Sequence, residues 1–175
     1  IVWVGTGEGN PRNSAGVGRG LFKSIDGGHT WRLMGLRQSE RIHRIITHPT
    51  NSDIVYVGVM GPAWSDGQER GLYRTLDGGR TWDRVLWQNP RSGIADLVMD
   101  PSNPDKLFAA MWEFRREPWF LTSGGQGSGL FVTYNRGDSW EQLSSAHGLP
   151  EGQLGRIGLA IAQSNPNVVY SLVEA

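Results

Sequence analysis

One eight-residue pattern occurs three times in this chain and constrains its fold more than any other feature. The pattern reads Ser or Thr, any residue, Asp or Asn, any residue, Gly, any residue, Thr or Ser, and Trp. Its copies span residues 24–31, 75–82 and 133–140. Self-similarity at a repeated interval indicates an array of one structural unit. Because Asp, Asn and Gly favour tight turns, we expect a β-hairpin in each copy.

Strand-like segments surround each copy in the same order. Runs of β-branched and aromatic residues, typical of strands, occupy residues 1–5, 54–58, 107–111 and 168–172. A Gly-Leu-aromatic segment leads into each motif, and Asn, Pro and Asp form a turn before each of the later runs. One unit therefore contains four strands, which we call inner, second, third and outer.

These units predict an all-β chain, since no segment shows a sustained helical period. We expect a partial first unit over 1–35, complete units over 40–87 and 92–144, and a partial fourth over 153–175. Four-stranded units of roughly 40 to 50 residues are typical of propeller blades. The chain is thus predicted to be a β-propeller segment of a little over three four-stranded antiparallel blades. Propellers close with about four to eight blades, so we expect the remaining blades of a longer parent chain to be partners.

Composition excludes several classes of function. The 17 basic and 17 acidic residues balance, whereas nucleic-acid and anionic-membrane surfaces need a basic excess. No apolar run approaches the roughly 20 residues of a spanning helix, so we expect no direct membrane insertion. There is no cysteine, and the four histidines lack metal-ligand spacing. We predict no metal and no cofactor.

We interpret the repeated motif as structural, because a residue that recurs in every unit does the same task in each. The alternatives are Ca²⁺ ligation by the Asp and a sugar platform on the Trp. In the structural interpretation, the Asp accepts turn N–H groups, the Gly supplies a positive φ, and the Trp covers the hairpin. The structural motif residues are Ser24, Asp26, Gly28, Trp31, Thr75, Asp77, Gly79, Trp82, Asn135, Gly137 and Trp140.

Function is expected in the irregular loops between second and third strands, since loops on a rigid scaffold carry binding and catalytic groups. These loops span residues 6–14, 61–69 and 112–126. The candidate ligand-binding residues are Trp64, Trp112, Arg115, Arg116 and Trp119. The candidate catalytic carboxylates, of which glycosidic cleavage needs two, are Glu8, Asp66, Asp96 and Glu117. The alternative is that the loop aromatics pack on a neighbour while the charged residues form solvated pairs.

Three inner-strand charges form a separate group. Arg44 and Asp96 are equivalent positions of successive units and fall on the same strand face, and Arg156 keeps that parity two residues away. Alternating charges around a channel favour a charge-balanced lining over an acid–base pair.

The repeated motif resembles the Asp-box, or BNR, repeat of sialidases, xyloglucanases and sortilin-type receptor propellers. The whole chain resembles bacterial "glycosyl hydrolase" or sortilin N-terminal-like propeller proteins. The segments that carry this resemblance are Val4-Gly5-Thr6-Gly7-Glu8-Gly9-Asn10, Asp100-Pro101-Ser102-Asn103-Pro104-Asp105 and Leu154-Gly155-Arg156-Ile157-Gly158. The sialidase Arg-Ile-Pro motif is absent from this sequence.

Two functions follow as expectations. The first is a non-catalytic binding or scaffolding propeller that engages a protein or glycan through its loop face, in an exported bacterial protein. The alternative is a glycoside hydrolase of the Asp-box type, whose active site is shared with blades outside this chain.

Overall fold

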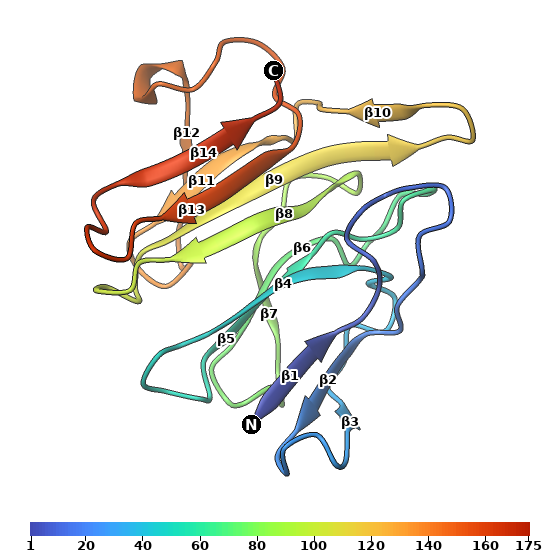
Figure 1. The fold of residues 1–175 in the computed structure, drawn as a ribbon, viewed down its shortest axis with the longest axis vertical. Coiled ribbons are helices and arrows are strands. Elements are labelled where there is room, and N and C mark those ends of the chain that lie inside the picture. The colour runs from blue at the N-terminus through green and yellow to red at the C-terminus, as the bar shows by residue number, and fades with distance from the viewer.

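The computed structural model describes residues 1–175 as consecutive antiparallel sheets (Figure 1). The first sheet contains β1 (Val2–Gly5), β2 (Leu21–Ser24) and β3 (Arg32–Leu33), and the second contains β4 (Ile42–Thr47), β5 (Val55–Val59), β6 (Gly71–Thr75) and β7 (Asp83–Leu86). The third contains β8 (Ser92–Met99), β9 (Leu107–Arg116), β10 (Leu121–Ser123), β11 (Gly129–Thr133) and β12 (Glu141–Leu143), and the fourth contains β13 (Ile157–Ile161) and β14 (Val169–Val173). A single 3₁₀ turn, η1 (Ser145–His147), is the one helical element. The predicted all-β fold and its inner-to-outer strand order are confirmed.

The third sheet differs from the prediction in one respect. The sequence predicts an irregular loop over residues 112–126, but β9 continues to Arg116 and pairs with β10. The hairpin is closed by the Glu117 N–H, which donates to the Phe120 carbonyl at 2.9 Å. The apolar alternation continues past Trp112 to Phe114, which is 1% exposed, and this buried ring keeps β9 extended.

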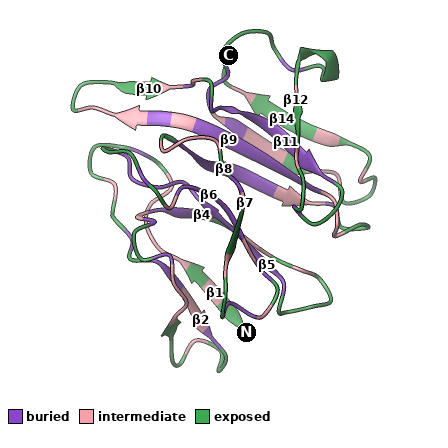
Figure 2. Ribbon diagram, turned by 180° about the vertical axis from the view of Figure 1, so that it is seen from behind, coloured by how far each residue is buried: buried purple, intermediate pink, exposed green.

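The hydrophobic core lies between sheets rather than inside each one. Alternate residues of one strand serve two interfaces, because successive side chains point to opposite faces. Val55 and Val57 of β5 pack toward the first sheet, whereas Tyr56 packs with the third sheet. The middle strands are therefore buried along most of their length, whereas β1 alternates exposed and half-buried residues (Figure 2).

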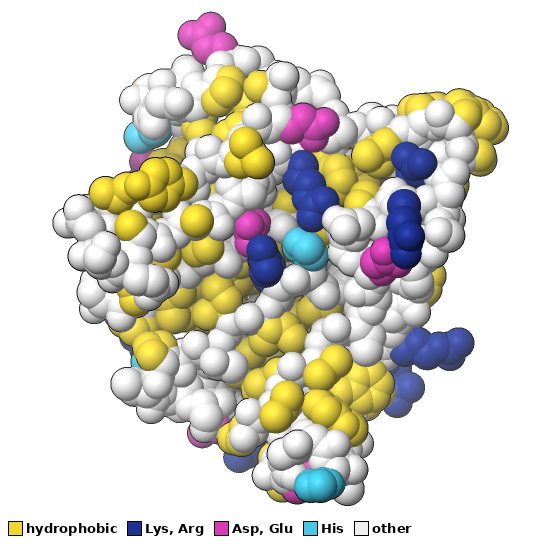
Figure 3. All heavy atoms as spheres, viewed as in Figure 1, with side chains coloured by type: hydrophobic (Ala, Val, Ile, Leu, Met, Phe, Trp, Pro, Cys, Tyr) yellow, Lys and Arg dark blue, Asp and Glu magenta, His cyan; other side chains and the backbone are white.

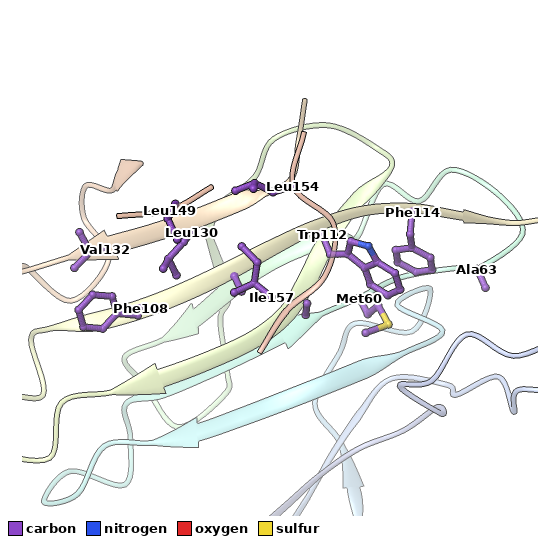
Figure 4. Packing of buried hydrophobic residues seen from close by; sticks show 12 residues of the cluster. Met60, Ala63, Phe108, Trp112, Phe114, Leu130, Val132, Leu149, Leu154 and Ile157 are labelled. Atoms are coloured by element: carbon purple, nitrogen blue, oxygen red, sulfur yellow. The ribbon is translucent and has the colours of Figure 1, made fainter. Parts of the chain in front are cut away.

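The largest core cluster joins the third sheet to its neighbours on both sides. Phe108 and Trp112 of β9 lie with Ile157 of β13 and with Leu154, which precedes that strand, and Met60, directly after β5, reaches the same cluster (Figure 4). This packing fixes the long β9 strand against two sheets at once.

The faces of β1 and β14 that point away from the core are open. Tyr170 and Leu172 of β14 are 64% and 82% exposed, whereas Tyr56, at the position of β5 equivalent to Tyr170, is fully buried. These apolar faces occupy the places where further sheets pack in a propeller.

The repeated motif forms one turn with one set of bonds. In the second copy, Asp77 accepts the backbone N–H groups of Arg80 and Thr81 at 2.9 and 3.0 Å and the Thr81 hydroxyl at 2.7 Å. Gly79, at φ 92°, donates its N–H to the Thr75 hydroxyl at 2.9 Å. These bonds hold the pKa of Asp77 well below its ordinary value, the Thr81 N–H being the largest cause.

The motif also joins neighbouring sheets. Lys23, which precedes the first copy, donates to the Gly78 carbonyl at 2.8 Å, and Arg74 donates to the Arg136 carbonyl at the same distance. Trp82 donates its indole N–H to the Met34 carbonyl of the preceding sheet at 2.9 Å. The basic residue directly before the motif, Lys23 or Arg74, thus makes the same bond to the next sheet in the first two copies.

Candidate functional site

The loops that leave the second strands meet at one end of the sheets. Asn13 of the first loop donates to the Pro118 carbonyl at 3.1 Å and accepts from Arg116 Nε at 2.6 Å. Arg115 donates to the Trp64 carbonyl at 2.8 Å and forms an ion pair with Asp66. The β9–β10 hairpin is therefore tied to the loops of both preceding sheets. We call this surface, formed by residues 6–18, 61–69 and 117–120, the loop face.

The candidate carboxylates differ in their partners. Glu8 accepts from Arg12 at 2.8 Å and from the Gly16 N–H at 3.2 Å, and these bonds lower its pKa. Asp66 pairs with Arg115 and lies 3.8 Å from Arg91. Glu117 is half-buried, and its carboxylate alone among the four forms no ion pair and no side-chain hydrogen bond. A solvated pair of Glu117 with Arg115 or Arg116, as the sequence suggested, does not form.

The aromatic candidates divide into exposed and buried rings. Trp119 is 80% exposed, its neighbour Phe120 is 48% exposed, and Trp64 is 41% exposed. The prediction that Trp112 binds a ligand at the surface is wrong, because this residue is only 2% exposed and its ring stacks on Phe114 with ring centroids 4.3 Å apart. The long β9 strand turns this ring into the core.

A second group of polar side chains lies on the face formed by the inner strands β4, β8 and β13, which we call the channel face. Basic, acidic and histidine side chains gather in the middle of this face (Figure 3). Arg44 Nε lies 2.6 Å from Asp96 Oδ1, so the two predicted lining charges form an ion pair. Asp96 also accepts the N–H groups of Leu97 and Leu159 at 2.8 and 2.9 Å. Buried and bonded in this way, Asp96 joins its own sheet to both neighbouring sheets and is poorly placed for acid–base chemistry.

A β-bulge sets the direction of the Arg44 side chain in β4 and of the Asp96 side chain in β8. The register of β4 against β5 shifts between Ile42 and Arg44, and that of β8 against β9 shifts between Ile94 and Asp96. Bulges re-aim side chains and often lie next to functional sites.

Sequence reasoning missed the role of His43. It lies at the β4 bulge, and its Nε2 is 3.3 Å from Arg156 Nη2. Burial, Arg156 and Arg44 together lower the pKa of His43, so the ring is neutral at neutral pH. A Cβ on Gly9 would lie 2.0 Å from His43 Nδ1, so the first loop packs directly on this ring. The one signal in the sequence for such a close approach was the pair of glycines, Gly7 and Gly9, in the first loop, because glycine lets the backbone come close to another group.

The largest cavity, of about 700 Å³, lies apart from both groups. It is bounded by η1, β12 and residues 149–154, and its polar lining includes Gln126, Gln142 and Gln153. It contains no aromatic ring and none of the candidate carboxylates. No group of three or more His, Cys, Asp or Glu side chains is arranged to hold a metal ion, and no helix is long and apolar enough to cross a membrane.

Comparison with known proteins identifies a matching family model and a similar enzyme. The family model described as "Sortilin, neurotensin receptor 3" matches residues 19–149. An oligoxyloglucan-reducing end-specific xyloglucanase of Emericella nidulans is 31% identical over 106 residues, which cover 58% of this chain and 11% of the relative. The chain thus spans about a tenth of the length of that relative.

Solved structures of GH74 enzymes share the fold. The Niastella koreensis GH74 enzyme superposes with a TM-score of 0.64 at 20% identity, over 95% of this chain and 22% of that one. The GH74 xyloglucanase of Xanthomonas campestris gives 0.62 at 18% identity, over 87% and 23%. An ancestral GH74 enzyme gives 0.62 at 23% identity, over 87% and 19%.

These matches show a β-propeller segment that corresponds to part of a larger propeller. The family model covers most of the chain, including all three copies of the repeated motif. The chain therefore belongs to the sortilin/Vps10 family of propeller proteins.

Proposed function

We propose that this chain is part of a glycoside hydrolase propeller that cleaves a polysaccharide at its loop face. The observation that carries the proposal is the β9–β10 hairpin, which places the unpaired carboxylate of Glu117 two residues from the exposed ring of Trp119. An accessible ring offers a sugar its flat apolar face. A carboxylate held by no cation can take or give the proton that glycosidic cleavage requires.

The relatives favour this function over the non-catalytic binding propeller that was our leading expectation. The fungal relative is named as a xyloglucanase, and the structural neighbours are titled as GH74 enzymes. A glycosidase needs two carboxylates, about 5 to 10 Å apart depending on stereochemistry. Glu8, Asp66 and Asp96 are each bonded to an arginine, so we assign the second carboxylate to blades outside this chain.

The other candidate residues, Arg115, Arg116 and Trp64, lie in or next to the hairpin that carries Glu117 and Trp119. Arg115 holds the backbone of Trp64 and the carboxylate of Asp66, and Arg116 holds the first loop through Asn13. We assign Arg115 and Arg116 to positioning the hairpin, and Trp64 and Trp119 to contact with the glycan. Cleavage of a polymer that is too large to enter a cell also agrees with the predicted location outside the cytoplasm.

The test is hydrolysis by the native protein that contains this segment, measured as release of reducing ends from xyloglucan and a panel of other polysaccharides. Glu117→Gln should lower turnover about 100-fold or more, because one acid–base group contributes about 10² to 10⁴. Asp83→Asn is the matched control, since Asp83 is an exposed carboxylate on outer strand β7 and pairs with Arg74, near the end of β6 that leads into the Asp-box turn and away from the 61–69 loop. It should leave turnover unchanged.

Two results would contradict the assignment. Full activity of Glu117→Gln would remove this hairpin from the chemistry. Binding of a polysaccharide without cleavage of any substrate would restore the non-catalytic binding propeller.

A further inference from the structure

The channel face carries two guanidinium groups with unused hydrogen-bond donors. Arg44 uses only its Nε, toward Asp96, and its side chain is 47% exposed. Arg156 bonds only neutral groups, namely Asn10 Oδ1 at 3.4 Å and His43 Nε2 at 3.3 Å. A guanidinium has five N–H donors in a planar fork, so most donors of both groups remain free for a ligand.

Arg156 is held in place before any ligand arrives. Its guanidinium carbon lies 5.2 Å from the centre of the Trp112 ring. That ring is buried, stacks on Phe114, and donates its indole N–H to Ser123 at 2.9 Å. Such a support lowers the entropy that binding would otherwise cost.

Of the two acidic groups nearby, Asp96 forms an ion pair with Arg44 through its Nε alone, and neither forms an ion pair with Arg156. Asp96 is 6% exposed and accepts three hydrogen bonds, so its charge lies beneath the surface. Glu174 is exposed, but its Oε2 accepts the Arg156 backbone N–H and the Ser123 hydroxyl, and it forms no ion pair with the Arg156 guanidinium. His43 between the two arginines is neutral at neutral pH. The Arg156 guanidinium therefore has no acidic partner, and the Arg44 guanidinium keeps unused donors beyond the Nε that pairs with Asp96.

We propose that Arg44 and Arg156 form an anion-binding site on the channel face that takes the carboxylate group of an acidic sugar. Arginine forks match the planar pair of oxygens of such groups. This inference rests on the proposed function and deepens it, since it assigns the substrate to the acidic polysaccharides. Asn10 and the first loop position Arg156, which places this site beside the loop face.

The test is calorimetric binding of oligogalacturonate, a cello-oligosaccharide of equal length, and sodium sulfate to the native protein. Oligogalacturonate should bind at least about tenfold more tightly than the neutral oligosaccharide, since one charge-assisted hydrogen bond supplies that factor or more. Its affinity should fall as salt rises. Arg156→Gln and Arg44→Gln should each weaken it about tenfold or more.

Two control variants keep the test decisive. Arg80→Gln removes an exposed arginine of an Asp-box turn and should bind as the unchanged protein does. Arg156→Lys keeps the charge and loses the fork, so it should retain part of the affinity, and a folded Arg156→Lys protein answers the question if Arg156→Gln does not fold. Equal affinity for both oligosaccharides, or unchanged affinity in the Arg44 and Arg156 variants, overturns the proposal. Binding of sulfate without oligogalacturonate also overturns it, by indicating a site for free anions.

This proposal and the proposed function can fail separately. Hydrolysis of neutral glucans without preference for acidic ones leaves the hydrolase intact and removes the anion site. Tight binding of oligogalacturonate without cleavage of any polysaccharide does the reverse.

Discussion

Asp77 and Asn135 occupy the same position in two copies of one turn, and they show what the turn requires of a residue. Asp77 accepts from the N–H and the hydroxyl of Thr81. Asn135 accepts the Ser139 N–H at 3.0 Å and donates its own amide to the Ser139 hydroxyl at 2.9 Å. The turn therefore needs an oxygen acceptor at this position and tolerates either a charged or a neutral one.

The charge of Asp77 gives the stability a dependence on pH. The folded-state pKa of Asp77 lies below its unfolded value, so the carboxylate contributes stability that is present above about pH 4 and is lost as pH falls through the folded pKa. Asp26 carries the same shift for the same reason. Urea unfolding between pH 2 and 7 should show this loss, and Asp77→Asn should reduce it. An unchanged pH profile in Asp77→Asn would contradict this account of the turn.

Gly28 and Gly79 occupy the same position of two Asp-box turns, and comparing them separates the cost of the positive φ from the cost of the contact between sheets. Gly28 and Gly79 have φ of 96° and 92°, so alanine at either should cost about 1 to 2 kcal/mol. A Cβ on Gly79 would also lie 2.6 Å from the Trp3 ring of the preceding sheet, whereas one on Gly28 would meet only Trp31, at 3.5 Å. The unfolding free energy should therefore fall further in Gly79→Ala than in Gly28→Ala. Equal losses would show that the inter-sheet contact yields freely.

At the scale of elements, the inner strands carry charges that tie sheet to sheet. Asp96 is almost fully buried and bonds Arg44 of β4 and the Leu159 N–H of β13, so one carboxylate spans three sheets. Its equivalence with Arg44 could be read from the sequence, because both precede a recognisable second strand by the same spacing. The bulges that bring the two side chains together could not, since a bulge is defined by how a strand pairs with its neighbour, and that register is a property of the folded sheet.

Asp96→Asn should destabilise the protein by about 1 to 3 kcal/mol, because a buried charge-assisted bond is lost while the shape is kept. Arg44→Gln should cost less, since Arg44 is 47% exposed and water replaces its partner. A double-mutant cycle measured by urea unfolding isolates the pair. A coupling energy near zero would show that Asp96 acts only through backbone bonds.

The strand order within each sheet was predictable from the sequence, but the β9–β10 hairpin that carries Glu117 and Trp119 was not. Repetition revealed the four-stranded unit, and turn chemistry located its corners. The β9–β10 hairpin has no counterpart in the other units, so no repeat could reveal it, and its Trp112 faces the core rather than a ligand. The His43–Arg156 contact joins residues 113 positions apart, beyond the reach of any local pattern.

At the scale of the whole molecule, neighbouring sheets share their hydrophobic cores, and the polar candidate residues lie at the ends of the sheets and on the channel face. Every residue of β5 and most of β9 is buried, so these strands can hold loops in place but cannot touch a ligand. The loop face and the channel face are where side chains that are not repeated reach solvent. The repeated Asp-box turns bond neighbouring sheets to one another, and the functions that we propose lie on the loop face and the channel face.

The measurement that tests this account most directly is a crystal structure of the native protein, carrying Glu117→Gln, in complex with an oligosaccharide of the proposed polysaccharide substrate. We predict a sugar ring on Trp119, the glycosidic bond beside residue 117, and a second carboxylate from another blade within about 10 Å of residue 117. An oligosaccharide bound elsewhere, with the β9–β10 hairpin bare and no second carboxylate near residue 117, would contradict it.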